Sequence, residues 1–311
     1  MADHLLDASL VHAFFDRDHP PRLEIASGDS VTFVCKDATD GQITPASDVS
    51  IYTGYDRSRA HALTGPVAVA GAEPGDTLEV EVLAFEHQGW GWTGYVPGGI
   101  GLLADEVDAP YLQHWEIDGD VCRFRDSGEV AVPFEPFCGV MGVAPAEPGR
   151  LNTAPPRANA GNIDIRGLTV GATAFFPVLA PGALFSTGDG HAAQGDGEVC
   201  GTGIEAPMTV TLRFRLRKDL SVPELRFLTP SPLTRADSAG YFATTAHGPD
   251  LYQNARNAVR SMVDWLQHER GMAREKAYVL CSVAADLKIS EVVDAPNWIV
   301  SCYLPLSVLT P

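Results

Sequence analysis

Basic residues are scarce in this chain. Its 311 residues include 22 lysines and arginines against 40 aspartates and glutamates, so the formal net charge is -18 at pH 7. A strongly acidic protein repels nucleic-acid phosphates, and it lacks the basic cluster that binds an anionic membrane surface. We therefore expect no nucleic-acid and no membrane partner, and consider cations and small neutral molecules as ligands.

Long apolar runs and paired cysteines are also absent. No run is long enough to span a bilayer, and Met1–Asp7 lacks the basic start and apolar core of a signal peptide. Without a Cys-x-x-Cys pair, a thiolate zinc site or a thioredoxin-type centre is not expected. The sequence predicts a cytoplasmic protein with reduced, mostly buried thiols. These are Cys35, Cys122, Cys138, Cys200, Cys281 and Cys302.

Several motifs of well-known sites are missing. There is no Gly-x-Ser-x-Gly elbow of an α/β-hydrolase, no His-Glu-x-x-His zinc helix and no Gly-Lys-Ser/Thr phosphate loop. These absences disfavour a serine hydrolase of that fold, a helix-borne zinc site and a nucleotide-binding loop.

The apolar pattern that is present favours β-structure. Apolar and polar residues alternate over Met208–Leu216 and Thr77–Phe85, which predicts half-buried antiparallel strands. Val31–Cys35 and Trp298–Leu304 are further strand candidates, separated by Gly-Asp and Pro-Gly turn signals. Many short strands with such turns indicate a sandwich or barrel.

The C-terminal part has a helical pattern. Apolar residues recur at helical spacing between Pro249 and Gly271, with the proline suited to the first turn and the glycine to the C-cap. A second helix is expected over 274–286. We therefore predict a β-rich catalytic region over 1–240 and an α+β region over 241–311 packed on it, or one continuous domain.

The segment Gly188–Gly201 combines glycines with an unusual density of polar side chains. Glycine lets the backbone approach a ligand closely, and in extended backbone residues two apart point to the same side. Asp189 and His191 could then point to one cation or transferred proton, and so could Asp196 and Glu198. The alternative interpretation is a solvated loop rich in turns. The polar residues are Asp189, His191, Gln194, Asp196 and Glu198.

The order of several motifs resembles the acetamidase/formamidase family from end to end. The motifs are Gly65-Pro66-Val67-Ala68-Val69, Gly71-Ala72-Glu73-Pro74-Gly75-Asp76, Gly139-Val140-Met141-Gly142, Gly161-Asn162-Ile163-Asp164, Pro181-Gly182-Ala183-Leu184-Phe185-Ser186, Gly188–Gly201 with Gly203-Ile204-Glu205, and Cys281–Ser290. Two departures are Asn159-Ala160 before Gly161 and the longer aromatic segment Trp90–Tyr95.

The resemblance implies a mainly β, jelly-roll-like fold with a smaller C-terminal α+β part. It also implies a metal-dependent homodimer or higher homo-oligomer that hydrolyses short aliphatic amides, formamide or acetamide, to the carboxylate and ammonia. Another small linear amide or a lactam is the alternative substrate, and a non-catalytic metal-binding β-sandwich is the alternative function. Cys200, inside the glycine-rich segment, is a fallback nucleophile, although none of the four lysines adjoins it.

Amide hydrolysis needs a polarised carbonyl, an activated water and a proton for the leaving nitrogen. Our candidate metal ligands combine one imidazole with carboxylates, a set that suits zinc, with calcium, magnesium or manganese as a second ion. Asp37 aligns with an acidic position of the family, and Glu205 is a ligand or an orienting residue. The candidates are His191, Asp189, Asp164, Asp37 and Glu205.

The remaining candidates would act on the substrate. Glu198 is the expected proton shuttle and Asp196 its alternative, while Gln194 would bind the substrate amide or the oxyanion. Trp90, Trp92 and Tyr95 are expected to wall a small apolar pocket or to cover a subunit contact. His61 and His114 have no partner pattern and are treated as structural.

Overall fold

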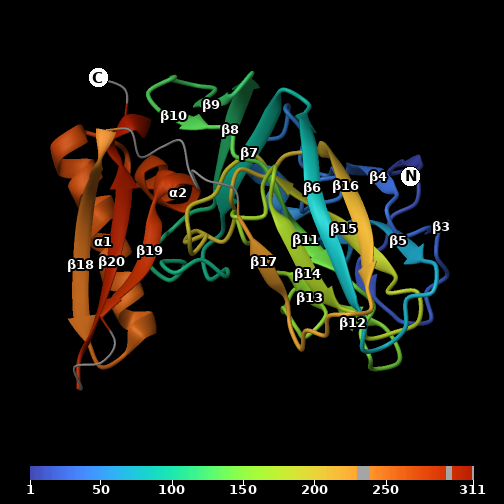
Figure 1. Cartoon of the computed structure of the whole chain (residues 1–311). Helices are drawn as coiled ribbons and strands as arrows, with labels where there is room; N and C mark the ends of the chain where they lie inside the picture. Colours follow the sequence, from blue (N-terminus) through green and yellow to red (C-terminus); the bar gives the residue numbers. More distant parts are fainter. Residues whose placement is uncertain (230–238, 292–295, 310–311) are drawn as a thin grey trace.

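Two facing sheets form the N-terminal part of the computed structural model, which describes residues 1–229, 239–291 and 296–309 (Figure 1). The first sheet has six strands and the second has five. In spatial order the first contains β1 (Asp3–Leu6), β4 (Ser30–Cys35), β16 (Met208–Arg217), β6 (Thr77–His87), β14 (Thr173–Pro177) and β17 (Arg226–Leu228). The second contains β13 (Ala160–Asn162), β11 (Phe137–Gly142), β15 (Phe185–His191), β5 (Leu63–Val69) and β3 (Leu23–Ile25).

Smaller elements complete this part of the molecule. A four-stranded sheet runs in the order β10 (Ala131–Pro133), β9 (Val121–Phe124), β8 (Tyr111–Asp118) and β7 (Trp90–Tyr95). β12 (Leu151–Asn152) pairs with β2 (Phe14–Phe15), and η1 (Val49–Thr53) and η2 (Arg57–Arg59) are short 3-10 helices. A further short 3-10 helix, η4 (Leu306–Val308), belongs to the C-terminal part.

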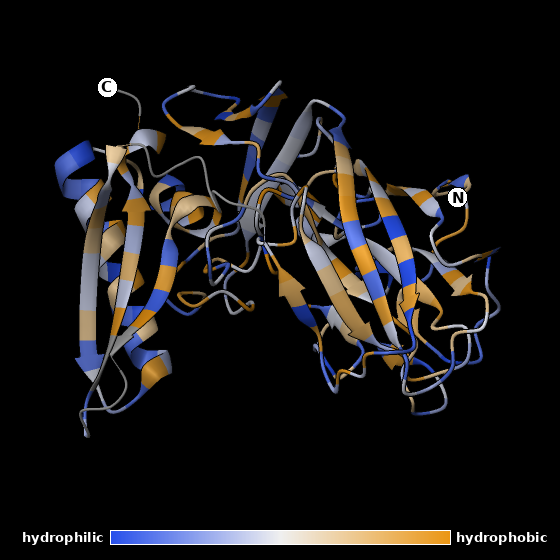
Figure 2. Ribbon diagram, viewed as in Figure 1, coloured by the Kyte–Doolittle hydropathy of each residue, from blue (hydrophilic) through white to orange (hydrophobic). Residues whose placement is uncertain are grey.

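The alternation in β16 places its apolar residues between the two sheets, as the sequence predicts. Met208, Val210, Leu212 and Phe214 are fully buried. Polar and apolar bands alternate along β6 and β16 (Figure 2). On the polar side, arginines of β16 pair with glutamates of β6, which is the favourable cross-strand arrangement of charges. These pairs are Arg213–Glu81, Arg215–Glu79 and Arg217–Glu79.

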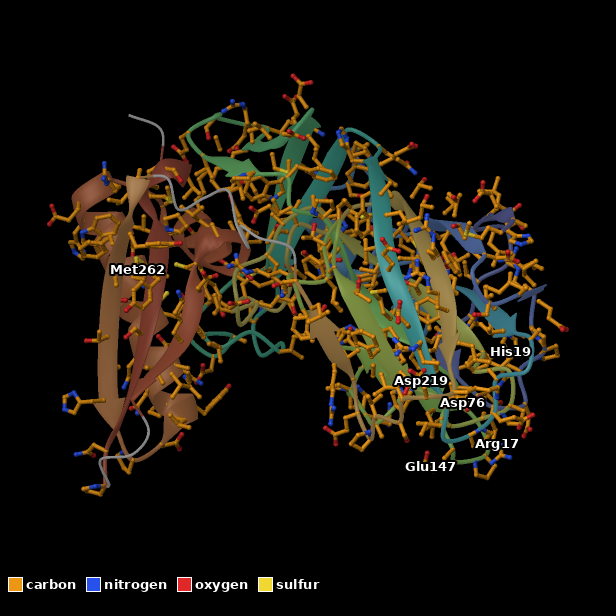
Figure 3. The ribbon with its side chains drawn as sticks, viewed as in Figure 1. Arg17, His19, Asp76, Glu147, Asp219 and Met262 are labelled. Carbon is orange, nitrogen blue, oxygen red and sulfur yellow. The ribbon has the colours of Figure 1, made fainter. Side chains whose placement is uncertain are left out.

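The C-terminal part is a three-stranded sheet with two helices. The sheet has the order β18 (Tyr241–Gly248), β20 (Trp298–Pro305) and β19 (Asp286–Glu291), and the helices are α1 (Leu251–Arg270) and α2 (Arg274–Ala284). Met262 marks α1 on one side of the molecule in Figure 3. Asp76 and Asp219, which lie in turns of the sandwich, are on the opposite side. The expected mainly β fold with a C-terminal α+β portion is confirmed.

The helix ends differ slightly from expectation. Pro249 lies outside α1, because Asp250 is the N-cap and its carboxylate accepts a hydrogen bond from the Gln253 amide. Gly271 is the expected C-cap, in a left-handed conformation with φ of 64°. The second helix ends at Ala284 rather than at Asp286, because Asp286 begins β19.

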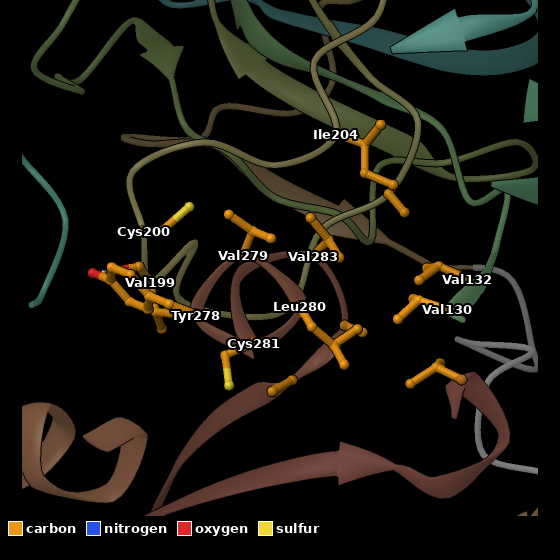
Figure 4. Packing of buried hydrophobic residues seen from close by; sticks show 14 of the residues in the cluster. Val130, Val132, Val199, Cys200, Ile204, Tyr278, Val279, Leu280, Cys281 and Val283 are labelled. Carbon is orange, nitrogen blue, oxygen red and sulfur yellow. Dashed lines mark hydrogen bonds between the residues drawn. The ribbon is translucent and has the colours of Figure 1, made fainter. Parts of the chain in front are cut away.

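Helix α2 is buried between the sandwich and the C-terminal sheet. Figure 4 shows Val279 and Val283 facing Cys200 of the glycine-rich segment and Ile204, which follows that segment. Ser282 also fixes this segment, since its hydroxyl accepts a hydrogen bond from the Cys200 amide and its carbonyl accepts one from the Gly195 amide. The helix therefore positions the segment that carries most of the candidate site.

All six cysteines are buried and unpaired, and their burial agrees with the expectation of mostly buried thiols. Among the described residues, neither helix combines the length and apolar character needed to cross a membrane.

Candidate metal and catalytic site

His191, the last residue of β15, is held in one orientation at the centre of the candidate site. Its Nδ1 lies 3.0 Å from the backbone oxygen of Asp189, and because a carbonyl only accepts, Nδ1 donates. The ring stacks on Phe137 with centroids 4.8 Å apart and 5° between the planes. In the neutral ring, Nε2 therefore carries the free lone pair, as in metal-binding histidines whose other nitrogen donates to a carbonyl.

Carboxylates from three parts of the chain surround this imidazole. Its Nε2 lies 3.1 Å from Glu205 Oε1 and 3.5 Å from Glu198 Oε1. Ligand atoms of His191, Glu198 and Glu205 all lie within 4.8 Å of one another, and so do those of Asp164, Asp189 and His191. A lone pair facing two carboxylates is unfavourable unless a proton or a cation lies between them.

Buried oxygens without a hydrogen-bond donor gather at the same place. Among the described residues, Asp164 Oδ1, Asp189 Oδ1, Gln194 Oε1 and Glu205 Oε2 are buried atoms for which the structure provides no donor. Buried polar atoms are nearly always paired, so such a group of acceptors indicates a ligand. The donor set of one imidazole and several carboxylate oxygens fits a divalent cation.

Gly139 of β11 leaves the space that this cluster needs. A Cβ atom at this position would lie 2.5 Å from Asp164 Oδ1, 2.6 Å from Asp189 Oδ2 and 2.6 Å from His191 Cε1. These distances are too short for any side chain, so only glycine allows the three groups to converge. In the sequence, Gly139 is recognisable only as part of a motif that resembles the family.

Burial and crowded negative charge raise the pKa of the acids. Burial, followed by repulsion from Glu205, raises the pKa of Asp189 to about 7. Burial raises the pKa of Asp164 well above its usual range, with Glu198 adding to the shift, and burial also raises the pKa of Glu205. Burial alone would lower the pKa of His191, but Glu205 and Asp189 raise it well above its usual value. The site therefore requires positive charge, from protons or from a cation.

Backbone strain marks the same residues. Asp164, Asp189 and Glu198 have positive φ angles of 46°, 59° and 42°, and His61 has one of 56°. Each such conformation in a non-glycine residue costs on the order of 1–3 kcal/mol and often accompanies a functional site. His61, which the sequence analysis treats as structural, lies with its Nδ1 3.1 Å from the Thr153 hydroxyl.

Asp37 has a different set of partners from the one expected of a ligand. Its Oδ1 accepts hydrogen bonds from the amides of Thr39 and Gly41, and its Oδ2 accepts one from the Trp92 indole at 2.8 Å. It lies outside both clusters found among the described residues. These contacts make Asp37 an anchor for Trp92, whose backbone pairs with that of Glu205.

The structure separates Asp196 from Glu198, although the sequence placed both on one side of an extended segment. The two do not converge, because Glu198 faces His191 and the half-exposed side chain of Asp196 pairs with Arg166 at 3.2 Å. Gln194 lies at the cluster, where its Nε2 donates to the backbone oxygen of Asp164 and its Oε1 remains free to accept.

The aromatic segment contributes to a pocket beside the site. Trp92 and Tyr95 line it together with Tyr52, a residue that the sequence analysis did not select. Trp90 is not among the lining residues. The sequence does contain two aromatic residues close together, Tyr52 and Tyr55, which could have been noted. They lie far along the chain from Trp92, and the three residues come together only in the folded protein.

Sequence comparison places the whole chain in one group of proteins. The profile of the Acetamidase/Formamidase family matches residues 3–150 and 148–310. An acetamidase from Mycolicibacterium smegmatis is 30% identical in an alignment of 252 positions that covers 61% of this chain and 62% of that protein.

Comparison with solved structures agrees. A gamma lactamase from Delftia acidovorans superposes with a TM-score of 0.92 at 25% identity, over 99% of this chain and 94% of the other. An acetamidase from Bacillus halodurans gives a TM-score of 0.69 at 32% identity, with 97% of each chain covered.

Proposed function

This chain belongs to the acetamidase/formamidase family of amidohydrolases that act on linear amides, and we propose that it hydrolyses short aliphatic amides at a divalent metal held by His191 and the surrounding carboxylates. The observation that carries the proposal is the group of buried oxygens without a hydrogen-bond donor around the His191 imidazole. The overall reaction converts an amide and water to a carboxylate and ammonium.

The ligands proposed for the metal are His191, Asp164, Asp189 and Glu205. Zinc fits a ligand set of one imidazole with carboxylates. The two clusters of possible ligands share only His191, so there is also room for a proposed second ion such as calcium, magnesium or manganese. A divalent cation held there would supply polarisation of the amide carbonyl and would lower the pKa of bound water to about 7. Asp37 is the weaker ligand candidate, because its oxygens accept hydrogen bonds from the Gly41 amide and the Trp92 indole.

Glu198 is the proposed proton shuttle. Its side chain is 20% exposed, whereas those of His191 and Glu205 are 1% and 3% exposed, so it is the more accessible carboxylate beside Nε2. Glu198 removes a proton from the attacking water and delivers it to the nitrogen as the C–N bond breaks. The exposed Asp196 is the weaker candidate because its carboxylate pairs with Arg166.

Gln194 is proposed to orient the substrate. Its Nε2 already donates to the Asp164 backbone, whereas its Oε1 has no donor among the described residues. The free oxygen can accept a hydrogen bond from the amide NH₂ group, which fixes the leaving nitrogen. The second hydrogen of Nε2 is not used by Asp164 and is the donor that stabilisation of the oxyanion needs, so both substrate roles of Gln194 stay open.

A lactam is the second candidate substrate. The specific observation in its favour is the TM-score of 0.92 with the gamma lactamase, compared with 0.69 for the acetamidase. Hydrolysis of 2-pyrrolidinone yields an amino acid and no ammonia, so the two activities are distinguished by their products. We also propose a homo-oligomer, as the family resemblance implies, which sedimentation of the purified protein would test.

Metal removal tests the proposal directly. We expect exhaustive chelation to abolish ammonia release from formamide, acetamide and propionamide, and added zinc to restore it, because the carbonyl is then no longer polarised. Elemental analysis measures bound metal, and circular dichroism checks that the stripped protein stays folded. Full activity in a protein free of metal would refute the mechanism.

A further inference from the structure

An aromatic pocket lies beside the proposed metal site. Its volume is about 180 Å³, and the lining residues that matter here are Tyr52, Tyr55, Trp92, Tyr95, Ile100 and Cys200. They come from the segment around η1, from β7, from the loop that follows β7 and from the glycine-rich segment. The proposed hydrolysis of formamide or acetamide leaves this pocket without a role.

The pocket and the metal site share a wall. The Trp92 amide donates to the Glu205 carbonyl at 2.9 Å, and the Glu205 amide donates to the Trp92 carbonyl at 2.8 Å. Glu205 in turn forms a bridge with His191. Because neighbouring strands lie about 4.8 Å apart, the backbones of Trp92 and His191 are separated by roughly 10 Å. Cys200, on the pocket side, follows Glu198 by only two positions.

The pocket is larger than the methyl group of acetamide requires. An apolar cavity of about 150 Å³ holds a benzene molecule. A ring of six heavy atoms therefore fits a pocket of about 180 Å³. Aromatic walls add favourable stacking and edge contacts to the burial of such a ring. Acetamide, with one methyl carbon beside its carbonyl, would leave most of this space to water.

The lining of the pocket includes a residue with an unpartnered hydroxyl group. Among the described residues, Tyr52 Oη is buried without a hydrogen-bond partner. The phenol packs directly against Gly94, where an added Cβ would lie 1.9 Å from Tyr52 Oη. Burial raises the pKa of Tyr52, so the phenol stays protonated and can donate to a polar atom of a ligand.

We infer that this pocket binds the acyl substituent of the substrate, so that the enzyme prefers carboxamides whose carbonyl carries an aromatic or alicyclic ring. The inference rests on the proposed function, because it places the carboxamide at His191. With the ring between Trp92 and Tyr52, the carboxamide extends along the Trp92–Glu205–His191 direction toward Nε2.

A matched pair of substrates tests the preference. Cyclohexanecarboxamide and isobutyramide both have a branched carbon beside the carbonyl, so their carbonyl reactivity is similar and the ring is the main difference. We expect kcat/KM for the ring amide to be higher by at least about tenfold, because each additional buried methylene contributes to binding. Equal or lower kcat/KM for the ring amide, with isobutyramide well hydrolysed, would overturn the inference while the proposed function stands.

A substitution that fills the pocket provides the second test. Ile100 lines the pocket yet is 88% exposed, so Ile100→Trp should fold normally while its indole competes with the ring. We expect the ratio of kcat/KM for the two amides to fall about tenfold toward one. Ile289→Trp on β19, at a site that is 62% exposed and outside the pocket, is the matched control and should keep the wild-type ratio. An unchanged ratio in Ile100→Trp would contradict the inference.

Direct binding separates this inference from the proposed function. If no amide is hydrolysed, the proposed function fails, and calorimetry with cyclohexanecarboxamide still measures occupation of the pocket. Binding to the wild type that weakens in Ile100→Trp supports the pocket, whereas heat of binding that is absent or equal in both proteins refutes it.

Discussion

At the residue scale, the roles of the site acids depend on which way each side chain turns. Sequence spacing grouped Asp196 with Glu198, but only Glu198 reaches His191 because Arg166 binds Asp196. The pairing of Asp189 with His191 is local, two residues apart on one strand, and could be predicted. The contact of Asp196 with Arg166 joins residues that are distant in the chain, so spacing could not reveal it.

The residue-scale prediction separates the shuttle from the ligands. Glu198→Gln should reduce turnover by about 10²–10⁴-fold, the usual contribution of a general acid or base, while bound metal stays near the wild-type level. Glu205→Gln, which changes the other glutamate beside Nε2, should instead lose metal. Steady-state kinetics and elemental analysis of both variants give the answer, and loss of metal from Glu198→Gln would reassign it as a ligand.

At the scale of elements, two neighbouring strands hold the imidazole of the site. β11 and β15 are antiparallel partners, and the register places Phe137 opposite His191, which explains the stacked rings. The sequence predicted strands wherever apolar and polar residues alternate, as in β16. It missed β15 as a strand because Phe185–His191 is buried along its whole length and shows no alternation.

Gly139 of β11 provides the element-scale prediction. Gly139→Ala should abolish metal binding and ammonia release, because the new methyl group would occupy the point where Asp164, Asp189 and His191 meet. Gly54→Ala is the control, since nothing lies within 4 Å of its added Cβ. Metal content and activity are measured alongside circular dichroism, and a Gly139→Ala protein with normal metal content would show that the cation does not bind at this cluster.

At the scale of the whole molecule, one core joins the two parts of the chain. Residues before 240, such as Trp115 and Val132, belong to the same buried cluster as Val279 and Leu280 of α2. The sequence suggested regions 1–240 and 241–311, or one continuous domain. We propose the single domain, because Ser282 of α2 is hydrogen-bonded to the glycine-rich segment. Its hydroxyl accepts from the Cys200 amide and donates to the Thr202 carbonyl, just after that segment.

Truncation tests this proposal. A chain that ends at residue 240 should lose cooperative unfolding, because the surface covered by α2 would expose apolar residues to water. Urea denaturation followed by tryptophan fluorescence, with the full chain as reference, measures the effect. A sharp unfolding transition with normal metal binding in the shortened protein would instead establish two independent domains.

The sequence by itself determined the mainly β class, both helices to within two residues, and the segment that carries His191, Asp189 and Glu198. These depend on periodicity, capping and local composition, which are properties of neighbouring residues. Only the tertiary structure decided that Asp37 anchors Trp92, that Gly139 vacates the centre of the site and that Tyr52 meets Trp92 beside Glu205. These contacts join residues far apart in the chain, and they exist only after the sheets and loops have packed.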